Sequence, residues 1–207
     1  MNFLKYIAAV ATVALCSPVI LFGAVPAWAD GHEITECDQL VSHGEDPDRV
    51  APGVSPVLLF AGEAACREAV AKDPENMRLR YQLARVLFYA QKTEESMPHL
   101  NFAAEAGSEQ AQFVLGYITD GGLQGVKKDT CKVEDLWVRS ARQGRFAARV
   151  SYPRHVANGR FKGCNIQASS SEIMSFLDAA KGQADGYYQE ILVEEVTATY
   201  SASDHAN

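Results

Sequence analysis

A recurring pattern of apolar and small residues, at intervals of 32 to 39 positions, is the strongest constraint on the fold of this 207-residue chain. Leu83-Ala84 and Leu115-Gly116 lie 32 positions apart, and both fall within stretches of helical periodicity. A spacing of 37 relates two further sets of residues. Leu100, Ala103, Ala104 and Gly107 recur as Trp137, Ser140, Ala141 and Gly144, and Gly122 recurs as Gly159. Trp137, Ser140 and Ala141 recur as Phe176, Ala179 and Ala180 at a spacing of 39. Such periods are typical of stacked helical hairpins, in which small residues let crossing helices approach closely.

The apolar spacing predicts helices over residues 36–42, 62–72, 77–90, 93–107, 109–120 and 130–143. Residues 44–56 contain three prolines and predict a loop of fixed shape. Thr93 is expected to cap one helix, and Ser169 with Glu172 to form a capping box for another. Pro153 is expected to kink or shorten its helix. Residues 185–200 fit a helix, while their β-branched side chains leave a strand as the alternative.

Residues 108–144 resemble a Sel1-like repeat, a relative of the tetratricopeptide repeat. The matching positions are Ala111, Gln112, Leu115, Gly116, Gly122, Val126, Asp129, Trp137, Ala141 and Gly144. Residues 77–107 resemble an ordinary tetratricopeptide unit, with Leu83, Ala84, Leu100 and Ala103 at its packing positions. Residues 145–183 resemble a degenerate unit, which departs from the pattern at Pro153. The resemblance implies an all-α fold, a right-handed α-solenoid of helical hairpins, and an adaptor or regulatory role in the cell envelope.

This organisation predicts five parts. Residues 1–29 form a signal peptide. Residues 30–75 form a disulfide-held leader with a helix, and this leader resembles the segment that precedes such repeats in some exported proteobacterial proteins. Residues 76–183 form three repeats, 76–107, 108–144 and 145–183. Residues 184–200 form a capping helix, because a solenoid must cover its last apolar face, and 201–207 form a loose tail.

The N-terminal sequence predicts export to the periplasm or beyond. Lys5 precedes an apolar run that ends at Ala27-Trp28-Ala29, which fits a signal peptidase site before Asp30. An uncleaved membrane anchor is the alternative, because the run is nearly long enough to span a bilayer. Acylation at Cys16 is disfavoured by the bulky Leu15 before it.

Cleavage would remove Cys16 and leave an even set of cysteines: Cys37, Cys66, Cys131 and Cys164. In an oxidising compartment four cysteines suggest two disulfides, for which three pairings exist. The pairs Cys37–Cys66 and Cys131–Cys164 are favoured because each joins neighbouring segments. Free thiols and a zinc site are the alternatives, and the absence of a Cys-x-x-Cys pair disfavours zinc.

The formal charge of −7 argues against nucleic acid and against anionic lipid as partners. No metalloprotease, serine-hydrolase or phosphate-loop motif is present, and the five histidines are scattered. No cofactor is expected. The sequence therefore favours a non-enzymatic protein-binding scaffold, and the alternative is an envelope enzyme acting on cell-wall peptide material.

In stacked hairpins the first helix of each pair lines a concave groove. The repeat phase places eight residues on or near it: Arg78, Tyr81, Arg85, Tyr89, Gln110, Phe113, Tyr117 and Arg154. Arginines and aromatics suit an extended, acidic or carboxylate-bearing peptide. The alternative is that Tyr81 and Phe113 belong to the core and that the arginines are solvated. After cleavage His32 would stand third in the chain, where the terminal amine, two amides and an imidazole could hold Cu(II) or Ni(II). Chance is the leading explanation for a histidine at this position.

Overall fold

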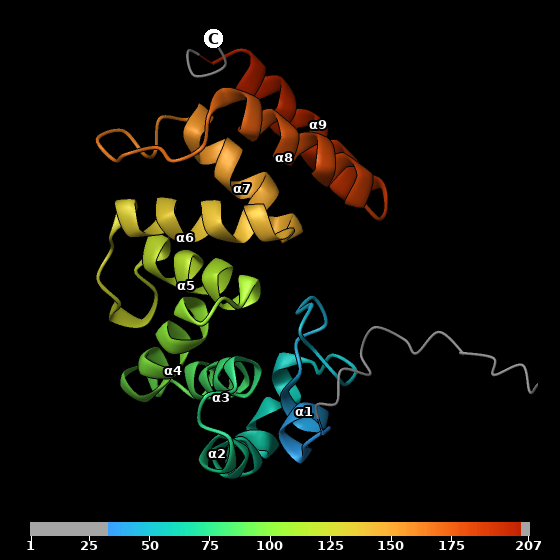
Figure 1. The fold of residues 1–207 in the computed structure, drawn as a ribbon, viewed down its shortest axis with the longest axis vertical. Helices are drawn as coiled ribbons and strands as arrows, with labels where there is room; N and C mark the ends of the chain where they lie inside the picture. The colour runs from blue at the N-terminus through green and yellow to red at the C-terminus, as the bar shows by residue number, and fades with distance from the viewer. Residues whose placement is uncertain (1–32, 204–207) are drawn as a thin grey trace, which may run out of the picture. The chain divides into compact units, whose positions relative to one another are not determined.

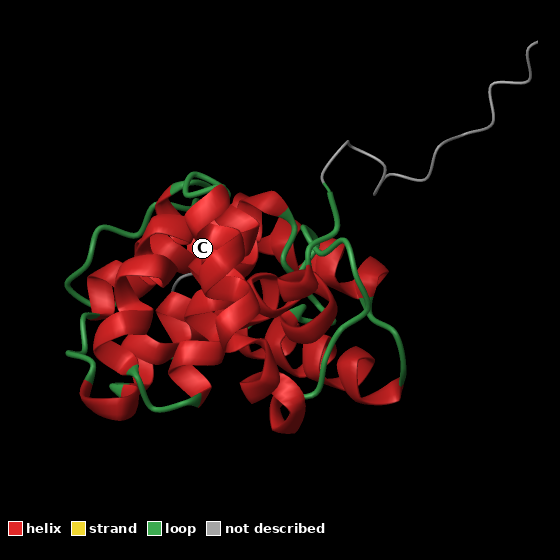
Figure 2. Ribbon diagram, turned by 90° about the horizontal axis from the view of Figure 1, so that it is seen from below, coloured by secondary structure: helices red, strands yellow, loops and turns green. Residues whose placement is uncertain are grey.

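The computed structural model describes residues 33–203, which form helices and loops throughout (Figure 2). The predicted signal peptide, its cleavage site, His32 and residues 204–207 lie outside this range. The described elements, in chain order, are α1 (Glu36–Val41), η1 (Pro56–Gly62), α2 (Glu63–Lys72), α3 (Met77–Tyr89), α4 (Thr93–Glu105), α5 (Glu109–Gly121), η2 (Leu123–Gly125), α6 (Thr130–Gln143), α7 (Phe146–Ala157), α8 (Ser170–Gln183) and α9 (Tyr187–Ser201).

Short polar side chains start most of the repeat helices. Asn76, Ser108, Asp129 and Ser169 each accept a hydrogen bond from a backbone N–H in the first turn of α3, α5, α6 and α8. The prediction for Thr93 is wrong, because this residue is the first residue of α4 and Lys92 precedes it without a side-chain cap. Four of these five helices therefore begin at a residue whose side chain caps the first turn.

Each helix packs chiefly against its neighbours in the chain, as expected for a solenoid (Figure 1). α3 pairs with α4 and α5 with α6, while α7 packs between α6, α8 and α9. The side chains at the repeat packing positions are buried: Leu83, Ala84, Leu100, Ala103, Leu115, Gly116, Trp137 and Ala141. The small residues act where helices cross, since the backbone of Gly116 on α5 lies directly against the indole of Trp137 on α6.

Pro153 neither ends nor markedly shortens its helix, contrary to expectation. α7 continues through it to Ala157, and Pro153 is buried. A proline inside a helix removes one backbone hydrogen bond, but α7 is held on both sides by α6 and α8. Tertiary packing therefore overrides the local preference, as it does for α9, which is a helix despite its β-branched residues.

The two disulfides join the pairs favoured from the sequence, Cys37–Cys66 and Cys131–Cys164. The first links α1 to α2 and is fully buried. The second links the first turn of α6 to the loop after α7. Each closes a loop of about 30 residues, which the loop-entropy model values at about 3–4 kcal/mol.

A buried carboxylate fixes the loop that follows α7. Glu134 on α6 accepts hydrogen bonds from the hydroxyl of Tyr152 at 2.8 Å and from the backbone N–H of Gln167 at 2.8 Å. Burial and the hydrogen bond to Glu134 raise the pKa of Tyr152 far above its usual value.

No helix within residues 33–203 is long and apolar enough to cross a membrane.

Candidate binding face on the repeat helices

The predicted groove residues lie on three helices that begin successive hairpins. α3 carries Arg78, Tyr81, Arg85 and Tyr89, α5 carries Gln110, Phe113 and Tyr117, and α7 carries Arg154. Their burial differs greatly, because another part of the chain covers half of this face.

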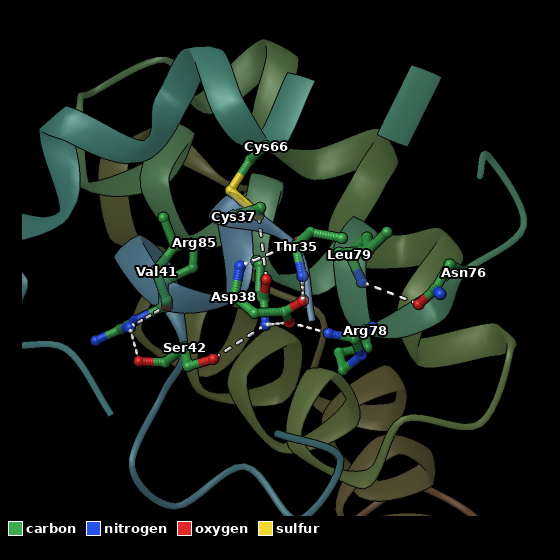
Figure 3. Close-up of a disulfide and its surroundings, with 11 residues drawn as sticks. Thr35, Cys37, Asp38, Val41, Ser42, Cys66, Asn76, Arg78, Leu79 and Arg85 are labelled. Atoms are coloured by element: carbon green, nitrogen blue, oxygen red, sulfur yellow. Dashed lines mark hydrogen bonds and ion pairs between the residues drawn. A yellow bond between two sulfur atoms is a disulfide. The ribbon is translucent and has the colours of Figure 1, made fainter. Parts of the chain in front are cut away.

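The covering element is the α1 segment (residues 35–54), which packs along α3 from Arg78 to Arg85. Asp38 of α1 forms an ion pair with Arg78, and both side chains are buried (Figure 3). Gln82 adds hydrogen bonds from its side-chain amide to Asp38 Oδ1 at 2.9 Å and Ser42 Oγ at 3.3 Å. A buried carboxylate needs partners of this kind, and the sequence supplies them from α3.

Arg85 also holds the α1 segment, but it does so through backbone oxygens. Its Nη1 donates to the carbonyls of Val41 at 2.5 Å and Ser42 at 2.8 Å, and its Nη2 donates to the carbonyl of Val54 at 3.0 Å. Its Nε finds no hydrogen-bond partner within the described residues. The guanidinium is thus buried, with 7% of the residue exposed, and every acceptor that it contacts is uncharged.

Two further contacts close the face between helices. Gln110 Nε2 of α5 donates to the hydroxyl oxygen of Tyr81 on α3 at 3.0 Å, and both residues are buried. Arg145, at the start of α7, pairs with Glu45 of the α1 segment at 2.7 Å and lies over the ring of Phe113 at 5.5 Å. The α1 segment therefore contacts both α3 and the start of α7.

Three of the eight predicted residues remain exposed. Tyr89 is 46% exposed and Tyr117 58% exposed, and Arg154 is exposed as well. Phe113 is half-buried and stacks on Trp137. Tyr81 thus belongs to the core, as the alternative interpretation held, but Arg78 and Arg85 are not solvated. The partner-binding role of the eight residues stays a prediction.

Beside Tyr89 lies a pocket of about 80 Å³, the α3–α5 pocket. Its lining residues are His43, Tyr81, Ala84, Arg85, Phe88, Tyr89, Leu100, Val114 and Ile118. Apolar side chains from α3, α4 and α5 make the walls, while His43 and Arg85 supply nitrogen donors or acceptors. Pockets for drug-sized molecules measure about 300–1,000 Å³, so this one is the size of a single side chain.

The electrostatics of the pocket are set by burial and by arginine. Burial, together with the positive charges of Arg85 and Arg145, lowers the pKa of His43 to about 4. His43 is therefore neutral at pH 7, and its Nδ1 accepts the backbone N–H of Glu45 at 3.1 Å. Burial and the charge of Asp48 raise the pKa of Asp46, which is 1% exposed, to about 7. At His43 the positive charges of Arg85 and Arg145 lower the pKa of the ring more than the negative charge of Glu45 raises it.

Sequence reasoning missed Asp38, Gln82, His43, Asp46 and Arg145 as members of this face. Three of these residues lie in or beside a loop that precedes the repeats, so no repeat phase assigns them a position. The one available signal was a charged residue inside a short cysteine-bearing helix, since Asp38 sits next to Cys37.

The remaining histidines and acidic residues of residues 33–203 are of the types that hold metal ions. Within that range no three His, Cys, Asp or Glu side chains gather into a metal-binding group. The adjacent Glu94 and Glu95 are exposed. His155 packs edge-on against Trp137 and faces Asp120 at 3.6 Å, while His99 contacts Arg80. These side chains take part in packing and pairing between helices.

The fold and this face define an all-α protein of stacked helical hairpins. No family model matches the chain, and no curated protein matches it. Among solved structures the chain is similar to the crystal structure of a Sel1 repeat protein from Oxalobacter formigenes, with 21% identity and a TM-score of 0.50. The likeness covers 63% of this chain and 94% of that protein. The described chain therefore has the fold of a Sel1 repeat protein, as residues 108–144 indicated, and at this identity the likeness concerns the fold alone.

Proposed function

We propose that this protein is a non-enzymatic scaffold of the periplasm or the extracellular space, which binds a peptide or protein segment on the face formed by α3 and α5. The observation that carries the proposal is the exposure of two tyrosines on these helices, Tyr89, which lines the α3–α5 pocket, and Tyr117 of α5. Tyrosines with an exposed ring are enriched at protein interfaces, because they bury a large area at a low cost in side-chain entropy.

Export is proposed on two grounds. The sequence of residues 1–29 fits a signal peptide, and two disulfides suit an oxidising compartment. Intact-mass measurement of the protein recovered from its native cell tests this. A mature chain that begins at Asp30 is expected, and a chain that keeps residues 1–29 would contradict cleavage.

We also propose that the repeats carry the binding and that the two ends close the stack. Residues 76–107, 108–144 and 145–183 are taken as the three units, with 30–75 and 184–200 as closing elements. The chain is acidic overall, and the arginines of α3 are buried. The exposed tyrosines are therefore taken as the contact area, with Arg154 at its edge.

Proximity labelling in the native compartment tests the binding face. The variant Tyr89→Ala/Tyr117→Ala is expected to lose the proteins that the unmodified chain labels. The matched control is Tyr188→Ala, which removes a tyrosine that is 86% exposed on α9. Identical labelling by all three proteins would refute the proposed face.

A further inference from the structure

We propose that the α3–α5 pocket receives one apolar side chain of a partner segment whose neighbouring residues are acidic. This inference rests on the proposed function, because it names the chemistry of the segment that the face would bind. It depends on three observations: the size of the pocket, its walls, and the unneutralised guanidinium at its edge.

The size and the walls select the anchor. The pocket measures about 80 Å³ and is lined by Ala84, Phe88, Leu100, Val114 and Ile118 among others. Such walls offer no hydrogen bond to a polar group, and a buried polar group without a partner is unfavourable. A single aliphatic or aromatic side chain fills this space and gains from leaving water.

The charge of Arg85 selects the flanking residues. Its guanidinium is buried at the pocket, donates hydrogen bonds to carbonyl oxygens, lies 6.0 Å from the centre of the Tyr89 ring, and keeps its Nε–H without an acceptor among the described residues. Asp46, the carboxyl group that also affects Arg85, holds its proton up to about pH 7 and so neutralises only part of the charge. A carboxylate on the partner would complement the remaining positive charge in a setting of low dielectric.

The neutral His43 adds to this preference. Burial and then the positive charges of Arg85 and Arg145 disfavour a further proton on the ring, so arginine charge acts at this side chain although the chain as a whole carries −7. Because Nδ1 accepts the Glu45 N–H, the remaining proton is on Nε2, which is a donor. Arg85 and His43 thus supply N–H groups to the lining, beside the hydroxyl groups of Tyr81 and Tyr89, and N–H groups favour an acceptor such as a carboxylate.

Three fluorescein-labelled nine-residue peptides test the proposal with the full mature chain. The first has a central Phe flanked by two Glu on each side, the second replaces every Glu with Lys, and the third replaces Phe with Gly. Fluorescence anisotropy is expected to show that the first peptide binds about ten-fold more tightly, or better, than either of the others. Equal affinities, or no binding of the first peptide at about 1 mM, would overturn the proposal.

Two variants locate the binding. Val114→Trp fills the pocket and is expected to abolish binding of the first peptide, whereas Val57→Trp, at a site that is 74% exposed on η1, is the matched control. His43→Glu places a negative charge at the mouth and is expected to remove or reverse the preference for Glu over Lys. Thermal unfolding followed by circular dichroism verifies that each variant folds.

The outcomes separate this proposal from the proposed function. If Tyr89→Ala/Tyr117→Ala loses its cellular partners but the three peptides bind alike, the face is a binding face and the anchor chemistry is wrong. If the chain instead forms a dimer that Val114→Trp abolishes, the pocket belongs to a second copy, and the proposal of an acidic partner is refuted.

Discussion

Replacing Gly116 by alanine tests whether the repeat positions work through close helix crossing. A Cβ at Gly116 would lie 2.3 Å from Trp137 Nε1 and 2.6 Å from Trp137 Cδ1. The indole cannot move aside freely, since its Nε1 donates to the Phe113 carbonyl at 3.0 Å and its ring packs against Phe113 and His155. The alanine must therefore displace a buried aromatic side chain.

The expected net loss of stability is about 2 kcal/mol. Overpacking a well-filled core costs about 1–3 kcal/mol, and weakening the indole hydrogen bond adds about 1 kcal/mol. The greater helix propensity of alanine offsets about 1 kcal/mol. For a chain of this length, about 2 kcal/mol corresponds to a decrease in Tm of about 4–8 °C.

Urea unfolding followed by circular dichroism measures the change, with Gly182→Ala as the matched control. A Cβ at Gly182 in α8 would have no atom within 4 Å, so this variant is expected to gain up to about 1 kcal/mol from helix propensity. In the Trp137→Leu background the cost of Gly116→Ala is expected to shrink. A Gly116→Ala protein as stable as the Gly182→Ala protein would refute the crossing argument.

Three further predictions follow from the described contacts. Asp46 holds its proton in the folded state up to about pH 7, whereas an unfolded aspartate releases it near pH 4. Its titration therefore lowers the free energy of unfolding by up to about 4 kcal/mol as the pH rises from about 4 to 7. Urea unfolding of Asp46→Asn between pH 4 and pH 8 is expected to lack this decrease. The effect of His43 on stability has the opposite sign, because its pKa is lowered to about 4. The free energy of unfolding therefore rises with pH from about 4 to 6.5, and His43→Gln is expected to lose that rise. A pH profile like that of the unmodified protein in either variant would contradict the burial assigned to the residue. Cys131→Ala/Cys164→Ala is expected to lose about 3–4 kcal/mol in the same unfolding assay, and a loss below about 1 kcal/mol would show that the disulfide constrains little of the unfolded chain.

The helices could be predicted because their information is local. Periodic apolar residues and caps such as Ser108 and Asp129 lie within the segments that they organise. The repeat spacing marked Gly116 and Trp137 as packing positions, and the structure shows that they contact each other. The exceptions are Thr93, which is the first residue of α4 rather than its cap, and Pro153, through which α7 continues while it packs between its neighbours.

The candidate face was only partly predictable because its burial depends on distant contacts. Arg78 and Asp38 are separated by 40 residues, and Arg145 and Glu45 by 100. A repeat phase places Arg78 on the groove face of α3, but it carries no information on which other segment covers that face. Tyr89 and Tyr117 stay exposed because the α1 segment leaves the end of the face open.

The contacts of the α1 segment also set an order of events during synthesis. Asp38 leaves the ribosome 40 residues before Arg78, and the carbonyls of Val41 and Ser42 leave more than 40 residues before Arg85. Until α3 exists, this short helix has no cation for its carboxylate, and six residues are too few for a stable isolated helix in water. The first of the described helices to be made is therefore among the later ones to take its final structure, since it must wait for the repeat that holds it.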